Sequence, residues 1–361
     1  MKKKSTETDR LKKQLTTKTE SNTDIPERDF LSMGSTLFNL SCSDYASGAI
    51  AKGSYVLLVG DTDTLKTWSC LTCMAEACQN PAFDNHRLIY DGPEGGAKMN
   101  IQKFFGTKLD KRLEIIEPSE DLEGFYYSVD SDLDEGTPFI RILDSITALG
   151  SEDDEKTYQK SKEAYEKGKT DEKGSYNLST PKQNSMKIKR LVSKLNKSES
   201  ILIIINQVRS NIGTSAMFKP DVVPGGRALP FYADLQVWMK PGEPLKKKVG
   251  KYDRQIGHEV KIIIKRSRYT GKKREIIIPV YHSYGMDDIG SSIDYLVREG
   301  HWKKGKQTIN AREFHISATK DKLISWIEEK EGALARLRKI VGHVWSSIEA
   351  ASNIKRKKRY T

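Results

Sequence analysis

Hydrophobic and polar positions follow two different periods along this chain. Short apolar runs alternate with longer segments in which apolar residues recur every three or four positions. An apolar run of about four to eight residues indicates a buried strand, whereas the longer spacing indicates a helix with one buried face. Strands are therefore predicted in five runs: Tyr55–Val59, Arg87–Tyr90, Phe139–Leu143, Ile201–Ile205 and Leu235–Met239.

The segments between these strands have helical character. Helices are predicted at three places: Thr67–Cys78, Ala97–Phe105 and Met186–Asn196. Alternating strands and helices are typical of a mainly parallel, twisted sheet flanked by helices, so an α/β core is expected over residues 29–285. At the edge of that sheet, the runs Glu259–Lys265 and Lys273–Val280 flank a turn at Thr270-Gly271 and predict a hairpin.

Three further parts lie outside this core. Residues 1–28 are polar and are interpreted as a short N-terminal arm. Residues 286–350 combine helical spacing with polar turns and are expected to form a small, α-rich C-terminal domain, followed by a basic tail over 351–361. Within the core, the segment 150–183 is charged and lacks apolar periodicity, so a mobile loop is expected there.

The charge balance narrows the class of partner. The 361 residues carry a formal net charge of +12, from 61 Lys and Arg against 49 Asp and Glu. Such an excess favours polyanionic partners, although a basic surface that is merely well hydrated has the same composition. The run Lys355–Arg359 fits either a DNA contact or a solvated tail.

Other sequence signals bear on location and on metals. No apolar run approaches the about 18 residues of a transmembrane helix, and the polar N-terminus has no apolar signal core, so a cytoplasmic protein is expected. Cys70 and Cys73 have a metal-like spacing but no second pair. Thiols packed on one helix are therefore favoured over a zinc site.

A phosphate-binding loop is predicted between the first strand and the next helix. The pattern is G-x-x-x-x-G-K-[ST], and Gly60, Lys66 and Thr67 fit it, whereas Leu65 stands where the second glycine belongs. Backbone N–H groups of such a loop point at ATP phosphates, the lysine reaches the β- and γ-phosphates, and the threonine hydroxyl binds Mg²⁺. If Leu65 needs a positive φ, the strain is about 1–3 kcal/mol. An ordinary strand–turn–helix is the alternative. The predicted nucleotide contacts are Gly60, Asp61, Thr62, Asp63, Thr64, Leu65, Lys66 and Thr67.

Acidic residues follow the second and third predicted strands, at the edge where open α/β sheets bind ligands. Asp144 ends the third strand and is a candidate to hold Mg²⁺ through water, the alternative being an aspartate that caps the next helix. After the second strand, Glu94 is the preferred carboxylate for activating water against a γ-phosphate, and Asp91 is the second choice. A polar turn is the alternative for this pair, because Gly92-Pro93 separates them.

The fourth strand leads into two segments that carry a family resemblance. Ile201–Ile205 runs into Asn206-Gln207-Val208-Arg209, and Gly225-Gly226-Arg227 opens a segment that reaches Asp234. These segments resemble the DNA-contacting switch region of the RecA/Rad51 recombinase family. The chain resembles in particular the phage, T4-type branch, which also carries a bulky residue beside the loop lysine. The resemblance covers about Ser32 to Asp288.

This resemblance implies roles for residues outside the phosphate loop. Gln207 would contact the γ-phosphate and pass its presence to a DNA loop over 209–227, and a first DNA loop would lie within 150–183. Lys265 and Arg268 would reach the ATP of an adjacent subunit, or else form the solvated bases of an amphipathic edge strand. Phe218 suits a stack on bases or a plug over the core. The implied DNA contacts are Arg209, Phe218, Lys219, Gly225, Gly226 and Arg227.

The implied function is that of a DNA-dependent ATPase with a RecA-like P-loop core, acting in homologous recombination and DNA repair. With ATP and Mg²⁺, copies would form a helical filament on single-stranded DNA and exchange strands with homologous duplex DNA. Loading or mediator proteins would be further partners, with no membrane. A phage-encoded protein would act in the host cytoplasm or nucleoid. Two alternatives stay open: a non-hydrolysing RecA-like accessory protein that binds DNA, suggested by Leu65, and a ring helicase with the same core.

Overall fold

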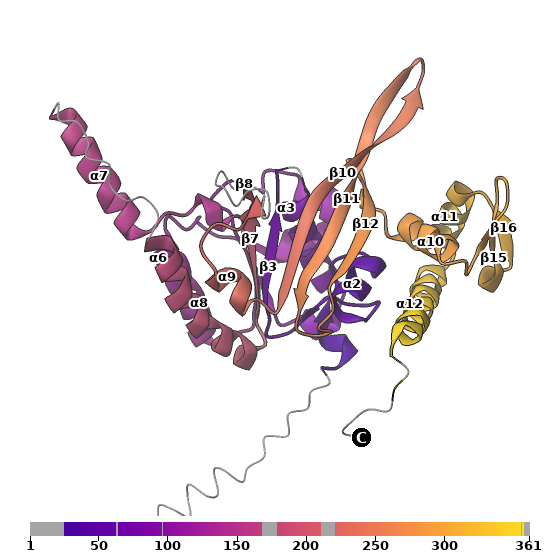
Figure 1. The fold of residues 1–361 in the computed structure, drawn as a ribbon, viewed down its shortest axis with the longest axis horizontal. Helices are drawn as coiled ribbons and strands as arrows, with labels where there is room; N and C mark the ends of the chain where they lie inside the picture. Colours follow the sequence, from indigo (N-terminus) through magenta and orange to yellow (C-terminus); the bar gives the residue numbers. More distant parts are fainter. Residues whose placement is uncertain are drawn as a thin grey trace, which may run out of the picture.

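The computed structural model describes residues 25–62, 64–95, 97–167, 179–210, 221–354 and 356. A nine-stranded sheet forms its centre (Figure 1). The last six strands of the following order are parallel, and the first three are antiparallel to their neighbours. The spatial order is β13 (Gly285–Met286), β12 (Arg274–Tyr281), β11 (Tyr252–Ser267), β10 (Leu235–Val249), β3 (Tyr55–Gly60), β7 (Ile201–Gln207), β6 (Phe139–Leu143), β4 (Arg87–Asp91) and β5 (Leu113–Ile115).

Helices cover both faces of this sheet. They are α2 (Thr36–Ser43), α3 (Lys66–Ala77), α4 (Ile101–Phe105), α5 (Thr107–Arg112), α6 (Leu122–Glu135), α8 (Ser179–Ser198) and α9 (Ala228–Tyr232). In β3, Val56 and Leu58 pack in one core with α3, whereas Leu57 and Val59 pack in a second core with α6 and α8. Burial on both faces explains why the parallel strands read as continuous apolar runs. The predicted α/β core is confirmed.

One strand is much longer than the sequence indicates. The prediction ends at Met239, but β10 continues to Val249 and pairs with β11 along its length. Pro241 and Pro244 are poorly suited to a central strand, which is why the sequence indicates a strand end there. The ladder accommodates these prolines through register shifts, one between Pro241 and Pro244 and one after Leu245. The predicted hairpin of β11 and β12 is present as an antiparallel pair.

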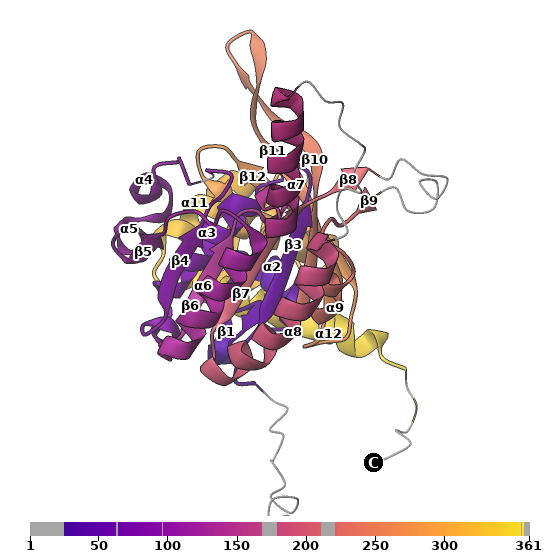
Figure 2. The same ribbon diagram turned by 90° about the vertical axis from the view of Figure 1, so that its left-hand side faces the viewer.

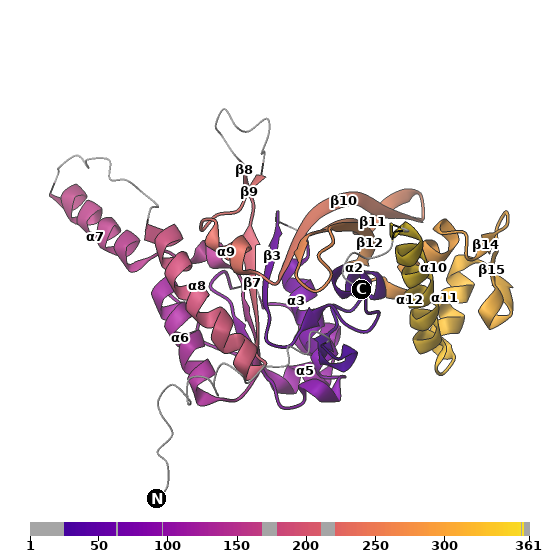
Figure 3. The ribbon, with the colours of Figure 1, turned by 60° about the horizontal axis from the view of Figure 1, so that its bottom comes forward.

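The segment 150–183 contains a helix where the sequence indicates a loop. α7 (Glu152–Glu166) begins with a capping box, in which Ser151 Oγ accepts from Asp154 N at 3.3 Å and the Asp154 carboxylate accepts from Ser151 N at 3.0 Å. Such a cap and charge pairs stabilise an exposed helix without any apolar stripe, so the missing periodicity did not predict it. Figures 1 and 3 show α7 projecting from the body. The i,i+4 ion pairs along it are Lys156–Glu152 and Lys167–Glu163.

Two short antiparallel pairs lie outside the large sheet. β1 (Phe30–Leu31) pairs with β2 (Ile50–Ala51). β8 (Arg209–Ser210) pairs with β9 (Asp221–Val222), and these strands lead into and out of residues 211–220. The second pair therefore brings the ends of the predicted DNA loop together.

The chain from Asp288 onward forms a further unit with its own core. Its elements are α10 (Asp288–Arg298), β14 (Lys303–Lys304), β15 (Ile309–Ala311), β16 (Ile316–Ala318), α11 (Lys320–Glu329) and α12 (Ala333–Ser352). Its apolar cluster includes Trp302 and Leu337, and Leu37 and Leu40 of α2 join the same cluster. The sequence did not predict the small sheet, because strands of two or three residues are too short to show a period.

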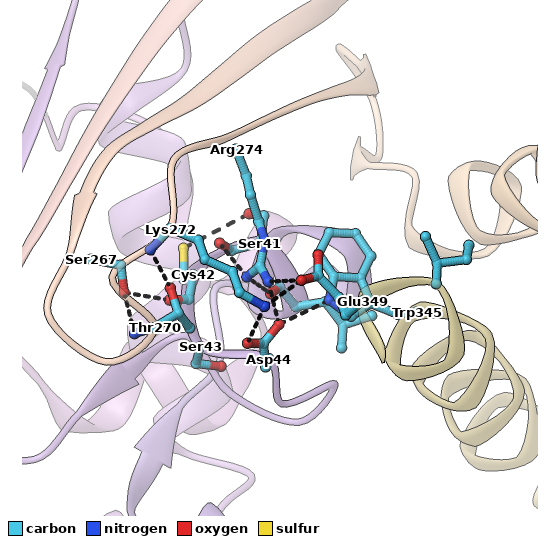
Figure 4. Close-up of polar contacts among 12 residues, drawn as sticks. Ser41, Cys42, Ser43, Asp44, Ser267, Thr270, Lys272, Arg274, Trp345 and Glu349 are labelled. Carbon is cyan, nitrogen blue, oxygen red and sulfur yellow. Dashed lines mark hydrogen bonds and ion pairs between the residues drawn. The ribbon is translucent and has the colours of Figure 1, made fainter. Parts of the chain in front are cut away.

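Charged side chains also join this unit to the core (Figure 4). The Arg274 side chain, only 8% exposed, lies 2.6 Å from Asp44 Oδ1 and 3.0 Å from Glu349 Oε2. Lys272 contacts the same glutamate, and Trp345 Nε1 donates to Asp44 at 3.0 Å. Burial raises the pKa of Glu349, but hydrogen bonds from Lys272 and Arg274 outweigh it and hold that pKa below its ordinary value. The cluster fixes α12 against the turn between β11 and β12.

The remaining signals concern membranes and thiols. Within the described ranges, no helix is long and apolar enough to cross a membrane. All four cysteines are buried and free, and Cys70 and Cys73 pack on α3 as the sequence indicates. Burial raises the pKa of the Cys42 thiol to about 12, so it is protonated at neutral pH.

Candidate nucleotide site and DNA-facing loop

A pocket of about 290 Å³ opens at the edge where β3, β6 and β7 end. The parallel ladders align these ends, because Gly60 pairs with Gln207 and Asp91 pairs with Leu143. Residues far apart in sequence therefore meet in one place. The lining consists of Thr62, Thr64, Leu65, Lys66, Thr67, Trp68, Glu94, Met99, Asp144, Ile205 and Gln207.

The phosphate loop places its lysine at the start of α3. Lys66 Nζ donates to the Asp61 carbonyl oxygen at 2.5 Å and to Thr64 Oγ1 at 3.3 Å. Burial lowers the pKa of Lys66, and the carboxylates of Asp144, Asp61 and Glu94 oppose that shift. A buried ammonium held by neutral oxygens gains from a nearby anion, so the position suits a phosphate.

Leu65 adopts a left-handed backbone, with φ 62° and ψ 27°. A positive φ was the condition for backbone strain at Leu65, and the structure meets it. The strain is about 1–3 kcal/mol. The Leu65 side chain packs against the core on the α3 side of the sheet, which offsets part of this cost. At the other end of the loop, a Cβ on Gly60 would fall 2.5 Å from the Met239 carbonyl oxygen, so only glycine fits. Of the other loop residues, Asp61 and Thr62 are exposed, Thr64 is buried, and Asp63 lies outside the described residues.

Thr67 and Asp144 meet in the pocket. Thr67 Oγ1 donates to Asp144 Oδ2 at 2.5 Å, and Tyr90 OH donates to the same oxygen at 2.8 Å. A hydroxyl beside a carboxylate supplies the oxygen ligands that Mg²⁺ takes, directly or through water, so these residues fit that ion. Tyr90 is not among the predicted site residues, and its place beside Asp144 follows from the pairing of β4 with β6. Burial raises the pKa of Tyr90, which keeps it a hydrogen-bond donor.

Glu94 and Gln207 face each other within the same pocket. Gln207 Nε2 donates to Glu94 Oε1 at 2.8 Å and to Oε2 at 3.1 Å. Ser145 Oγ donates to Glu94 Oε1 as well, and Thr147 Oγ1 lies 3.5 Å from that oxygen. The glutamate is therefore oriented by groups from the ends of β6 and β7.

Asp91 lies away from this pocket. Its carboxylate is fully buried, lies 2.9 Å from Arg141 Nη2, and accepts from Ser119 N at 3.0 Å and Ser119 Oγ at 2.7 Å. The Arg141 side chain is itself only 1% exposed. A carboxylate enclosed in this way does not meet water at the pocket, so the structure does not bring together the two candidates for water activation. The contacts of Asp91 are structural, and Glu94 alone of the pair lines the pocket.

Two buried asparagines attach the glycine pair to the sheet and to α8. Asn206 Nδ2 donates to the Pro224 carbonyl oxygen at 3.0 Å. Asn184 Nδ2 donates to the Gly225 carbonyl oxygen at 2.9 Å, and its Oδ1 accepts from Tyr126 OH at 2.6 Å. Asn184 was missed from sequence because it lies at the end of the charged segment, where no local pattern marks it.

The backbone conformation and close packing of Gly225 and Gly226 explain why both residues are glycine. Both glycines are among the DNA contacts that the family resemblance implies. Gly225 and Gly226 adopt φ of 86° and 88°. A Cβ on Gly225 would lie 2.9 Å from Asn184 Nδ2, and one on Gly226 would lie 2.8 Å from Pro181 Cβ. The pair is therefore required by left-handed turns that pack on α8.

The other implied DNA contacts are placed unevenly. Arg209 lies in β8, where its backbone pairs with Val222. Arg227 is exposed and precedes α9. Phe218 and Lys219 lie outside the described residues.

Lys265 and Arg268 do not reach the pocket of their own chain. Lys265 Nζ lies 5.4 Å from the centre of the Trp238 ring, and Arg268 lies 3.3 Å from Asp234. Arg268 follows Ser267, which pairs with Leu235 at the start of β10. The pocket lies beyond the opposite end of the β10–β3 ladder, where Met239 pairs with Gly60. Any contact of these cations with a nucleotide would involve a second copy.

Comparison with known proteins points to one family. Residues 170–287 match the model of the RecA N-terminal domain. Protein RecA of Thermus aquaticus is 29% identical over 156 residues, which cover 43% of this chain and 44% of that protein. Protein RecA of Streptococcus parasanguinis is 28% identical over 143 residues, covering 36% of this chain and 37% of that protein. The chain thus matches less than half the length of these curated relatives.

The matched residues include β7, the glycine pair and the strands β10 to β12. The phosphate loop lies before them in the sequence. Together with the mainly parallel sheet between two layers of helices, the match establishes a RecA-like α/β core.

Proposed function

We propose that the protein is a RecA-like, DNA-dependent ATPase of homologous recombination and DNA repair. The convergence of Lys66, Thr67, Asp144, Glu94 and Gln207 in one pocket carries the proposal. In this proposal, copies assemble as helical filaments on single-stranded DNA and exchange strands with homologous duplex DNA, helped by loading or mediator proteins. Similarity to the phage branch rests on Leu65 beside the loop lysine.

Each pocket residue has a distinct part in this proposal. ATP supplies a γ-phosphoryl group, and Mg²⁺ neutralises its charge. Lys66 binds the phosphates, while Thr67 and Asp144 hold the metal ion. Glu94 accepts the proton of an attacking water, for which its orientation by Gln207 and Ser145 prepares it.

Gln207 links this chemistry to DNA. Its amide bonds to Glu94, and the adjacent Asn206 bonds to Pro224 just before the glycine pair. A γ-phosphate competes for the Gln207 amide, so its arrival or loss shifts the end of β7 and the loop 209–227. Arg209, Phe218, Lys219 and Arg227 are the proposed DNA contacts of that loop. Because Lys265 and Arg268 lie far from their own pocket, they are proposed to act on the ATP of the adjacent copy.

The test is steady-state ATP hydrolysis with and without single-stranded DNA, with Lys66→Ala as the control. Stimulation by DNA that the variant lacks is the expected result. Pairing of homologous strands under the same conditions tests the finer proposal. A protein that hydrolyses ATP without any pairing activity would contradict the recombinase assignment and favour another motor of this core.

One observation favours a second candidate function. The left-handed Leu65 makes the loop costlier to form than a glycine would, which suits an accessory protein that binds DNA without turning over ATP. That candidate predicts tight DNA binding, no hydrolysis, and no effect of Lys66→Ala on binding. Hydrolysis that depends on Lys66 excludes it.

A further inference from the structure

Tyr90 places a hydroxyl group against the carboxylate that is proposed to hold the metal ion. It lies in β4, which pairs with β6, and Figure 2 shows these strands side by side. Tyr90 is 1% exposed, and its OH donates to Asp144 Oδ2 at 2.8 Å. Asp144 lines the nucleotide pocket but Tyr90 does not, so the tyrosine acts on the pocket only through that aspartate.

The two hydrogen bonds on the Asp144 carboxylate fall on the same oxygen. Thr67 Oγ1 donates to Oδ2, as the Tyr90 hydroxyl does. Within the part of the chain that the structure describes, no group donates to Asp144 Oδ1. One carboxylate oxygen is therefore occupied by two donors, and the other is left for a ligand in the pocket.

Tyr90 keeps its proton beside this carboxylate. Burial raises the pKa of Tyr90, and the charge of Asp144 raises it further, so the phenol is a hydrogen-bond donor at neutral pH. The Thr67 hydroxyl is itself proposed to bind Mg²⁺, whereas the Tyr90 hydroxyl has no second task. Tyr90 therefore holds the carboxylate in the same way whether or not an ion is bound.

The glycine two residues later makes room for the tyrosine ring. A Cβ on Gly92 would fall 2.6 Å from Tyr90 Cε1, and the three nearest atoms to that Cβ all belong to Tyr90. Gly92 does not have a positive φ, so its backbone conformation does not require glycine. The requirement at this position comes from the ring of Tyr90.

This arrangement suits an ion that takes one oxygen from the carboxylate. Mg²⁺ keeps several waters and is bound through one or two carboxylates, whereas Ca²⁺ takes six to eight oxygens and accepts two from one carboxylate. Hydrogen bonds on Asp144 Oδ2 oppose such a two-oxygen contact. Removal of the groups that orient a metal ligand typically costs about 10- to 100-fold in metal affinity.

We propose that Tyr90 is a positioning residue, which holds the Asp144 carboxylate so that only one of its oxygens serves the metal ion and Mg²⁺ is favoured over Ca²⁺. The inference rests on the Mg²⁺–ATP site proposed above, and it adds a residue that touches neither the ion nor the nucleotide. Gly92 belongs to the same arrangement, because it leaves the space that the ring occupies.

The test measures the binding of a fluorescent ATP analogue to the full chain over titrations of Mg²⁺ and of Ca²⁺, and also in EDTA. Tyr90→Phe removes only the hydroxyl. Tyr269→Phe is the matched control, because the Tyr269 OH also donates at 2.8 Å, to Ser54 Oγ. Ser54 precedes β3, at the end of that strand opposite the pocket. Thermal unfolding reports the stability of both variants.

For Tyr90→Phe, the Mg²⁺ concentration at half-maximal nucleotide binding is expected to rise about tenfold. The corresponding Ca²⁺ concentration rises less, so the preference for Mg²⁺ shrinks, while binding in EDTA stays at the wild-type level. Tyr269→Phe leaves all three values unchanged. An unchanged Mg²⁺ requirement in Tyr90→Phe overturns the proposal. Equal losses with Mg²⁺ and Ca²⁺ also overturn it, because a merely structural role would weaken both alike.

A second variant keeps the test decisive if Tyr90→Phe lowers stability. Gly92→Ala crowds the Tyr90 ring but keeps the hydroxyl, so it is expected to raise the Mg²⁺ requirement of the wild type and not that of Tyr90→Phe. Equal effects in both backgrounds would overturn the proposal, since Gly92 would then act independently of the hydroxyl. Wild-type protein whose nucleotide binding ignores Mg²⁺ would contradict the Mg²⁺–ATP site itself, so the two failures are distinguishable.

Discussion

The Gln207 side-chain amide donates to both carboxylate oxygens of Glu94, at 2.8 and 3.1 Å. The contact ties the end of β7 to the turn after β4. The residue proposed to activate water and the residue that leads into the DNA-facing loop are therefore held in one arrangement. Under the proposed function, disturbing either partner alone is expected to separate ATP hydrolysis from its control by DNA.

Replacing the two acids after β4 distinguishes catalysis from folding. Glu94→Gln is expected to lower kcat for ATP by about 10²- to 10⁴-fold with little effect on stability, because it removes a general base but keeps one oxygen that accepts from Gln207 and Ser145. Asp91→Asn is expected to destabilise the fold by about 1.5–3 kcal/mol, because it removes the charge of one of the two carboxylates, Asp91 and Asp132, that pair with the buried Arg141. Steady-state kinetics and urea denaturation of both variants check this. Equal losses of kcat in two stable variants would return Asp91 to the catalytic role.

Removing the amide of Gln207 tests its link to DNA. Gln207→Met keeps a similar length and lacks the donor, so the contact with Glu94 is lost. Stimulation of ATP hydrolysis by single-stranded DNA is expected to fall by about 5- to 150-fold, with a much smaller change in the rate without DNA. Gln207→Glu serves as the second variant, because it places a like charge beside Glu94 and should lower both rates. A Gln207→Met protein with full stimulation would show that the DNA signal takes another route.

The left-handed backbone of Leu65 predicts that glycine is more stable than alanine at this position. In a helix interior alanine is preferred to glycine by about 1 kcal/mol, but Leu65 is the N-cap of α3, where glycine is the better of the two. At φ 62°, glycine avoids a steric cost of roughly 1–2 kcal/mol, so Leu65→Gly should be more stable than Leu65→Ala. Urea denaturation of the two variants measures the difference. The matched pair removes the effect of lost leucine packing, which is common to both. A more stable alanine variant would mean that the loop relaxes out of this conformation.

The contacts of Arg274 with Asp44 and Glu349 predict that removing this side chain loosens the attachment of the C-terminal unit. Arg274→Ala removes the more buried of the two cations, Arg274 and Lys272, that join Asp44 to Glu349, and the expected loss of stability is about 1.5–3 kcal/mol. Arg298→Ala is the control, because the Arg298 pair with Glu299 is exposed and such pairs contribute about 0–1 kcal/mol. Thermal unfolding and limited proteolysis near residue 287 report the two effects. Equal behaviour of both variants would show that apolar packing alone attaches α12.

A second carboxylate of the C-terminal unit gives a dependence on pH. Glu313 accepts from Trp302 Nε1 at 2.6 Å and from Arg312 Nε at 2.9 Å. Burial raises its pKa, but these hydrogen bonds prevail and lower it from 4.5 to about 2. A carboxyl whose pKa is lower in the folded than in the unfolded protein stabilises the fold above the unfolded pKa. This contribution is lost as the pH falls from the unfolded pKa to the folded pKa. The difference in the free energy of unfolding between wild type and Glu313→Gln should therefore be greatest above about pH 4.5 and shrink as the pH falls from about 4.5 to about 2. Urea titrations over that range check this, and a constant difference would contradict it.

The sequence predicted the parts of the fold that have a period or a motif. The apolar strands and the loop around Lys66 follow from local patterns, and the ends of parallel strands then bring Lys66, Asp144 and Gln207 together. Tyr90 and Asn184 have no such local signal, since each acts on a partner far away in sequence. The part of β10 beyond Met239 was missed because Pro241 and Pro244 oppose a strand, and the pairing of β10 with β11 beyond them maintains it. In each case the missing information is which residues, far apart in sequence, meet in the folded protein.

Strand β10 lies directly beside the first residue of the predicted phosphate loop. Met239 pairs with Gly60, and the backbones approach so closely that a Cβ on Gly60 would fall 2.5 Å from the Met239 carbonyl oxygen. The same strand continues outward to Val249. A displacement of the outer part of β10 is therefore expected to reach the first residue of the predicted phosphate loop along one hydrogen-bonded ladder, without crossing a loop.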